Sequence, residues 1–157
     1  MAERAVLEEY AEAVARNLRE SWTEPVPKFR ADLLIYDAVF KADSEYGLDP
    51  ESHALTTAAT AEKYKARMTV YVEGGAVELD VEADGYYKSR GGDLVRIEEG
   101  STELWEALER DLGGEVTDVR TSTTALYAVV KRPGGGSRWV RLEPVYMLSL
   151  VDYEIHA

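Results

Sequence analysis

The chain contains no cysteine and no glutamine, and Asn17 is its only asparagine. Without cysteine there are no disulfides, no thiolate metal ligands and no cysteine nucleophile. Loss of Asn, Gln and Cys together with a charged fraction of 31% is a composition expected of proteins that work at high temperature. We therefore expect a thermophilic archaeal or bacterial source, although a designed chain could show the same bias.

Long apolar runs are also missing, and those present are short, such as LLIY at 33–36. A membrane-spanning helix needs about 20 consecutive apolar residues, so no span is expected. The first 17 residues carry acids where a signal peptide needs bases. These absences predict a cytoplasmic protein that makes no membrane contact.

Helical spacing of apolar residues predicts a helix over residues 3–22, which the segment Glu24–Pro27 ends. The residues that recur every fourth position are Val6, Tyr10, Val14, Leu18 and Trp22. Residues 28–46 fit either a buried helix or a buried strand, because few positions are polar. We favour a helix closed by Gly47, followed by a short turn or helix that begins at Asp49-Pro50.

Strict alternation on both sides of Gly74-Gly75 predicts a β-hairpin within residues 62–84. If the two glycines form the turn, the numbers of opposed residues sum to 149, with Arg67 opposite Glu82 and Tyr71 opposite Glu78. This register collects the apolar side chains on one face and opposes charges on the other. We therefore expect one face of the hairpin to be buried.

The remainder of the chain predicts a helix at 101–113, opened by Ser101, among further strands. We expect those strands near 94–98, 116–121, 124–132, 138–143 and 145–155, the last with Val145, Met147, Ser149, Val151, Tyr153 and Ile155 on one face. The order predicts one α+β domain over 1–157, mostly antiparallel sheet built from hairpins, with N-terminal helices and the inserted helix packed on it. The helical part covers about 1–60 and the β-rich part about 62–157.

The sequence contains no nucleotide-binding or nucleophile-elbow motif, and we expect no cofactor. The two histidines, His53 and His156, have no metal-ligand spacing. We interpret His53 as a surface or cap residue beside a helix start, and His156 as a solvated residue near the end of the chain.

Three acids are weak candidates for a metal site: Asp80, Glu98 and Glu99. An acid on one strand and acids at the end of the next hold magnesium in many phosphodiesterases. With the order helix, three strands, helix, strand, residues 52–121 resemble the restriction-endonuclease-like nuclease superfamily. That family's Asp/Glu-x-Lys motif reads Glu98-Glu99-Gly100 here. The lysine that helps to activate water is missing, so the resemblance implies a nuclease relative, either active or inactive.

A basic segment stands out in a chain whose formal charge is -12. Residues 119–142 contain five bases and no acid, a local charge of +5. The candidate binding residues are Arg120, Tyr127, Lys131, Arg132, Arg138, Trp139 and Arg141. Segregated charge of this kind indicates an anionic partner or an acidic protein surface.

These features predict a small non-enzymatic binding or assembly module. We expect its basic hairpin, residues 120–141, to dock an acidic protein surface or a second subunit, which would make a homo-oligomer. One alternative is single-stranded nucleic-acid binding, in which Trp139 and Tyr127 stack bases and the arginines contact phosphates. The other is the metal-dependent nuclease relative described above.

Overall fold

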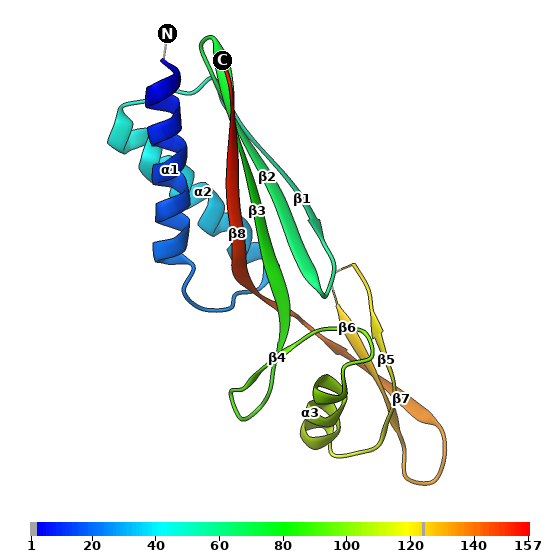
Figure 1. Ribbon diagram of the computed structural model, residues 1–157. Helices are drawn as coiled ribbons and strands as arrows, with labels where there is room; N and C mark the ends of the chain where they lie inside the picture. The colour runs from blue at the N-terminus through cyan, green and yellow to red at the C-terminus, as the bar shows by residue number, and fades with distance from the viewer. Residues whose placement is uncertain (1–2, 124) are drawn as a thin grey trace.

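The computed structural model describes residues 3–123 and 125–157. It contains two N-terminal helices, a larger antiparallel sheet, an inserted helix and a smaller antiparallel sheet, which confirms the predicted α+β class (Figure 1). The elements are α1 (Arg4–Ser21), α2 (Lys28–Tyr46), β1 (Ser52–Ala59), β2 (Lys63–Val72), β3 (Gly75–Lys88), β4 (Leu94–Arg96), α3 (Thr102–Leu112), β5 (Val116–Thr121), β6 (Leu126–Lys131), β7 (Ser137–Leu142) and β8 (Val145–His156).

Helices α1 and α2 lie side by side on one face of the larger sheet (Figure 1). Their buried stripes enter the first hydrophobic cluster together with the inward residues of β2 and β3. The Asn17 amide donates to the Ala38 carbonyl at 3.2 Å and joins the two helices. Residues 28–46 are therefore helical, as favoured, and Gly47 closes α2 in the left-handed region at φ 61°.

Strand β3 is the centre of the larger sheet, because it pairs with β2, β4 and β8, while β1 extends the sheet beyond β2. Side chains on β2 and β3 alternate between buried and solvent-facing positions. The solvent-facing side carries bases on β2 and acids on β3. Arg67, for example, bonds both Glu78 at 2.7 Å and Asp80 at 2.9 Å.

The predicted register of the β2–β3 hairpin is wrong by two residues. Opposed residues sum to 147, so Arg67 faces Asp80, Tyr71 faces Ala76, and the turn is Glu73-Gly74. Gly74 takes the positive φ of 87°, whereas Gly75 already belongs to the strand. A Cβ on Gly75 would lie 2.1 Å from the His156 backbone oxygen. Glycine is therefore needed at this position to make room for the end of β8, and not to form the turn. A shift of two preserves the buried face.

Two further expectations are corrected. The segment after Asp49-Pro50 is neither turn nor helix: it leads into β1, which pairs antiparallel with β2. The prediction of a single continuous face on β8 also fails, because the β3–β8 register shifts between Glu82 and Ala83. Ile155 is buried on one side of the shift and Tyr146 on the other, which brings even-numbered positions inward near the start of β8.

The smaller sheet has the order β5-β6-β7, and α3 packs on one of its faces. The Ser101 hydroxyl accepts from the Leu104 N–H and caps α3, as expected, and Gly113 ends the helix at φ 66°. The Trp105 indole donates to the Val116 carbonyl at 2.8 Å and fixes α3 against β5. The predicted start of a strand at 124 lies outside the described residues; β6 begins at Leu126.

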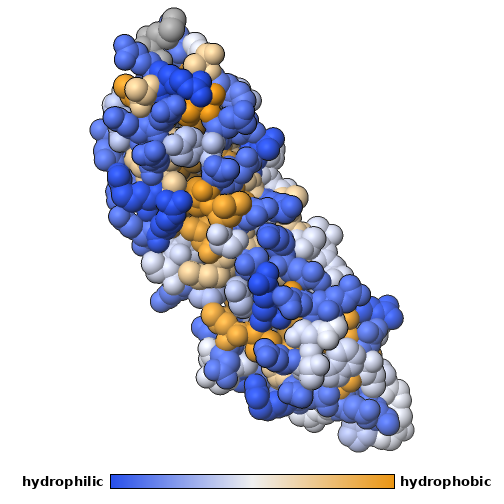
Figure 2. All heavy atoms as spheres, in the orientation of Figure 1, coloured by the Kyte–Doolittle hydropathy of each residue, from blue (hydrophilic) through white to orange (hydrophobic). Residues whose placement is uncertain are grey.

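The face of the molecule drawn in Figure 2 is largely hydrophilic. Figure 2 shows charged and polar residues over most of one face, with an apolar patch where β8 runs beside α1. Within the described residues, no helix is both long enough and apolar enough to cross a membrane.

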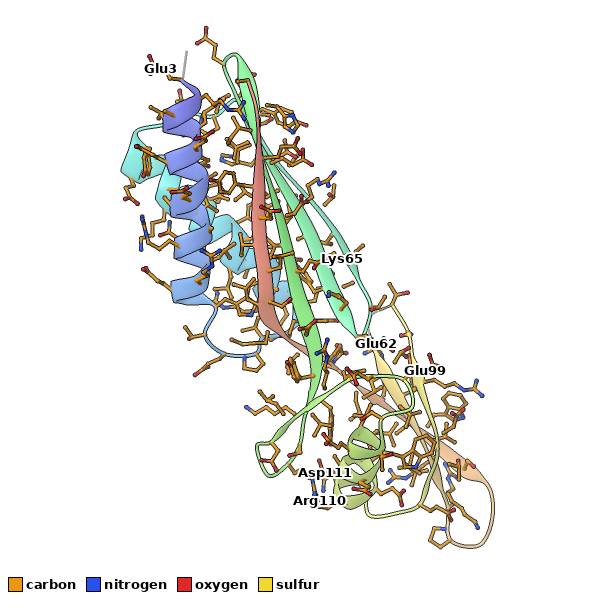
Figure 3. All side chains as sticks on the ribbon, in the orientation of Figure 1. Glu3, Glu62, Lys65, Glu99, Arg110 and Asp111 are labelled. Atoms are coloured by element: carbon orange, nitrogen blue, oxygen red, sulfur yellow. The ribbon has the colours of Figure 1, made fainter. Side chains whose placement is uncertain are left out.

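Buried tyrosine–carboxylate hydrogen bonds join separate elements. Tyr64 donates to Asp32 at 2.6 Å, and Tyr87 donates to Asp111 on α3 at 2.5 Å (Figure 3 labels Asp111). Burial, then the bond to Asp111, raises the pKa of Tyr87 to about 12. Burial, then the charge of Glu143, raises the pKa of Tyr146 to about 12. The neutral phenols are therefore favoured by the fold.

The raised tyrosine pKa values predict alkaline unfolding. An unfolded tyrosine ionises near 10.0, whereas folded Tyr87 ionises near 12. The stability from this difference is complete below the unfolded pKa and is lost as pH rises through the folded pKa. We expect the free energy of unfolding, measured by urea denaturation, to fall between pH 10 and 12. Tyr87→Phe should flatten this fall, and an unchanged slope would contradict the assignment.

The close approach of β8 to Gly75 predicts a sensitive position. Gly75→Ala should lower the free energy of unfolding by about 1–3 kcal/mol, because the methyl group must displace backbone. Gly91→Ala is a matched control, since its Cβ would meet nothing closer than Ser89 Oγ at 3.9 Å. Equal stability of the two variants in urea denaturation would refute the close approach.

Candidate functional site

The outer face of the smaller sheet brings together four of the predicted binding residues: Arg120, Tyr127, Trp139 and Arg141. The strand pairing places Tyr127 between Arg120 and Arg141, and Val129 beside Trp139. Their sequence neighbours Ala128 and Val140 pack in the cluster with α3. Since side chains alternate along a strand, the four residues lie on the face away from α3. We call this set the Trp139 platform.

In the Trp139 platform two aromatic rings and a guanidinium group contact one another. The Tyr127 and Trp139 rings lie edge to face, with centroids 6.2 Å apart. The Arg120 guanidinium lies 5.1 Å from the Trp139 ring centroid, within cation–π distance. Trp139 nevertheless remains 56% exposed. A large aromatic ring is thus held in place by neighbours while facing solvent.

Acids on either side of the basic segment neutralise much of its positive charge. Asp118 bonds Arg120 at 2.7 Å, Glu143 bonds Arg141 at 2.5 Å and Glu115 approaches Lys131 at 3.8 Å. These acids lie just outside residues 119–142, so five bases minus three acids leave a net charge of +2 for residues 115–143. The net charge in this part of the chain is therefore smaller than the +5 of residues 119–142 alone.

Titration shifts follow from these contacts. The hydrogen bond from Arg120 holds the pKa of Asp118 below its usual value. Hydrogen bonding to Tyr127, followed by the charge of Glu143, raises the pKa of Arg141. Both groups therefore stay charged across the physiological range.

Arg132 and Arg138 lie apart from the Trp139 platform, whereas Lys131 ends β6 opposite Ser137, on the same face of the strand as Tyr127. Arg138 is on the opposite face of β7, where its guanidinium donates to the Leu112 carbonyl at the end of α3. Arg132 lies in the loop between β6 and β7, and its N–H donates to the Gly136 carbonyl. The basic segment therefore does not form one continuous basic face.

The three candidate metal ligands belong to two places. Asp80 lies on β3 with Arg67 at 2.9 Å, whereas Glu98 follows β4 with Arg96 at 3.2 Å. Glu98 and Glu99 line a cavity of about 360 Å³ with Arg120, and Asp80 is not among its lining residues.

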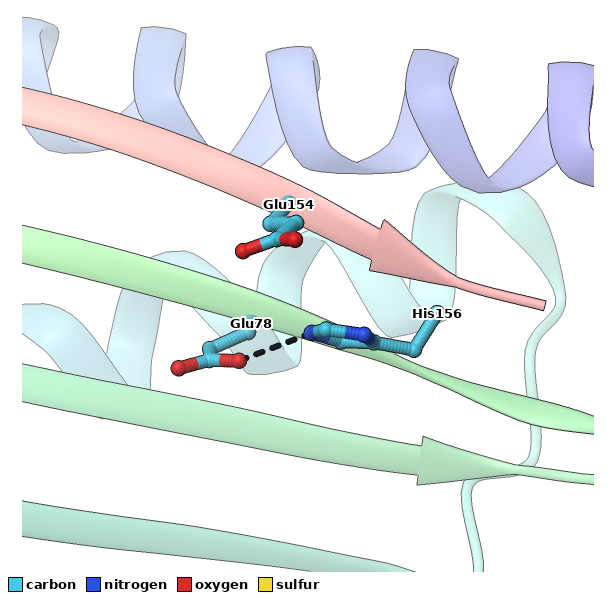
Figure 4. A group of neighbouring side chains, drawn as sticks. All are labelled: Glu78, Glu154 and His156. Carbon is cyan, nitrogen blue, oxygen red and sulfur yellow. Dashed lines mark hydrogen bonds and ion pairs between the residues drawn. The ribbon is translucent and has the colours of Figure 1, made fainter.

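A group that the sequence reasoning missed lies on the solvent-facing side of the larger sheet. Glu78, Glu154 and His156 place ligand atoms within 4.8 Å of one another, the one such group among residues 3–123 and 125–157. His156 Nε2 lies 2.8 Å from Glu78 Oε2 (Figure 4). Imidazole with carboxylates can bind a divalent transition metal, but Arg67 already neutralises Glu78. Only the β3–β8 pairing, which the sequence does not reveal, brings these residues together.

His53 is a second residue that the sequence reasoning misplaced. It lies on β1, not beside a helix start, and its side chain is largely buried. The Asp43 carboxylate accepts a hydrogen bond from the Tyr10 hydroxyl at 2.5 Å, and it lies 2.7 Å from His53 Nε2. The Phe40 ring meets the His53 ring edge to face at 5.1 Å. This group connects α1, α2 and β1.

Comparisons with protein-family models, with curated proteins and with solved structures find no match for this chain.

The exposure of Trp139 predicts that it contributes little to stability. Trp139→Ala should change the free energy of unfolding by about 0.5 kcal/mol or less, as surface substitutions usually do. Trp22→Ala should cost about 3–5 kcal/mol, because Trp22 is buried and donates to the Tyr146 carbonyl. Urea denaturation measures both. A cost for Trp139 close to that for Trp22 would show that it is a core residue and not a platform.

Proposed function

We propose that this protein is a non-catalytic docking module whose Trp139 platform binds an acidic surface of another protein. The observation that carries the proposal is the exposed Trp139 ring, which contacts Arg120 and Tyr127 on the smaller sheet. Trp, Tyr and Arg are the residues that most often dominate protein–protein binding energy. A platform already ordered before binding loses little side-chain entropy on association.

Electrostatics define the chemistry of the partner. The ion pairs of Arg120 and Arg141 are exposed, and exposed ion pairs contribute little to stability. Carboxylates of a partner can therefore exchange with Asp118 and Glu143. The partner surface that fits presents an apolar group to Trp139 and acids to the two arginines.

Single-stranded nucleic acid is the second candidate, and the same stacking favours it, since aromatic rings and arginines on strands bind bases and phosphates. The net charge of +2 over residues 115–143 and -12 over the chain weakens this candidate. The nuclease alternative receives no support from Asp80, which lies apart from the cavity that Glu98 and Glu99 line.

The test begins with partner capture on immobilised wild type and Trp139→Ala, followed by calorimetry with the purified partner. We expect Trp139→Ala and Arg141→Glu each to weaken binding by about 2 kcal/mol or more. Arg132→Glu is the matched control, because it makes the same charge change in the neighbouring loop, away from the Trp139 platform. It should lose much less affinity.

A nucleic-acid titration on the same proteins distinguishes the second candidate. Fluorescence anisotropy with single-stranded DNA and RNA should show no specific binding by the wild type. Tight binding that weakens steeply with salt and is lost in Trp139→Ala would replace the protein partner with nucleic acid. Equal partner binding by Arg132→Glu and Arg141→Glu would contradict the Trp139 platform as the docking site.

A further inference from the structure

Helix α2 carries a largely exposed apolar stripe, of which the half-buried member, Tyr36, also packs against the first hydrophobic cluster. Phe29 is 68% exposed, Phe40 50% and Leu33 47%. Tyr36 stacks on Phe40 with centroids 5.8 Å apart and completes the stripe. The spacing of 4, 3 and 4 residues is that of a seam between two helices. Large exposed apolar residues in one line indicate a surface that another molecule covers.

The edge strand β1 lies under the same part of α2. Phe40 and Asp43 of α2 both contact His53 of β1. Among the described residues β1 pairs with β2 alone, so its other edge is free. Thr57 is exposed although its partner Ala66 is buried, so the helices leave β1 uncovered at this position. A free edge and an uncovered stripe therefore adjoin.

β1 lacks the features that protect the other edge strands. Its sequence, SHALTTAA, has no acid, no lysine, no arginine and no proline. By contrast, β8 and β5 carry charges and a register shift, and β7 carries Arg138 and Arg141. Charges and bulges at an edge prevent pairing with another sheet. In a chain with 30 acids, an eight-residue edge without charge points to a strand that pairs.

We propose that β1 and the α2 stripe form the interface of a two-fold symmetric dimer of this chain. One two-fold axis beside β1 joins β1 to β1 of the second copy in antiparallel pairing and continues the sheet. The same axis brings the two α2 helices together in antiparallel orientation. Phe29 then lies near Phe40 of the second copy, and Leu33 near its Tyr36. Both exposed features are covered by a single operation.

Charges beside the stripe identify a second copy as the occupant. Arg30 and Asp37 are exposed and flank the stripe on one side, seven residues apart. The ion pairs of α2 within the described residues are made by Lys28, Asp32, Asp43 and Glu45, so neither Arg30 nor Asp37 is paired. In the antiparallel pair, Arg30 faces Asp37 of the second copy and Asp37 faces its Arg30. The helix is thus complementary to itself.

Sedimentation velocity over a dilution series tests the dimer. The wild type should dimerise. Its dissociation constant should fall as salt is added, because salt screens the repulsion between two chains of charge -12. Leu33→Glu and Thr57→Lys should each raise the dissociation constant at least about tenfold. Leu94→Glu is the matched control: Leu94 is 44% exposed on β4, and this variant should dimerise like the wild type. Circular dichroism confirms that each variant is folded.

Charge exchange tests the symmetry itself. Arg30→Asp and Asp37→Arg alone place like charges opposite each other and should weaken the dimer, whereas the double variant restores opposite charges and should recover it. A wild-type chain that remains monomeric at all concentrations and salts overturns the proposal. So does equal dimerisation of Leu33→Glu and Leu94→Glu, or a double variant no better than the singles. Binding of an extended peptide by a monomeric wild type would assign β1 to a peptide partner instead.

Discussion

The fold depends on one fourteen-residue strand, β3, which is paired along both edges. Its inward-facing residues contribute to both hydrophobic clusters: Leu79 packs under α1 and α2, and Tyr87 packs against α3. Such close pairing leaves no room for side chains at Gly75 and Gly85, where a Cβ would lie 2.1 Å and 1.9 Å from backbone oxygens of neighbouring segments. The two sheets are positioned by this strand, and so are the surfaces they present.

The solvent-facing surfaces then divide by charge. The open side of the larger sheet pairs bases of β2 with acids of β3, as Arg67 does with Glu78 and Asp80, and is largely self-satisfied. Two of these surfaces, the Trp139 platform and the α2 stripe beside β1, carry the most exposed large apolar side chains of the described residues, which are Phe29, Trp139 and Phe40. They lie on different sheets, so one molecule can present both at once. This separation is what a docking module that also forms a dimer requires.

Local patterns predicted most of the fold. Helical spacing and glycine caps were enough for the helices, and alternation was enough for the hairpin faces. The register failed because two consecutive glycines fit a turn, while the contact of Gly75 with the backbone of His156 is invisible in sequence. β1 was missed because threonine and alanine give no clear periodicity. The seven candidate binding residues were grouped only by their place in one basic segment, and the sequence did not show that Arg138 takes the opposite face from Arg141, because that depends on where α3 packs.

We propose that the chain keeps two separate interaction surfaces, one for its own copy and one for a partner. Amide hydrogen exchange followed by mass spectrometry, on the wild type alone over a concentration series, measures this most directly. We expect protection from exchange to rise with concentration in Ser52–Ala59 and not in Ser137–Leu142. Protection that rises in Ser137–Leu142 instead, or in neither segment, would contradict it.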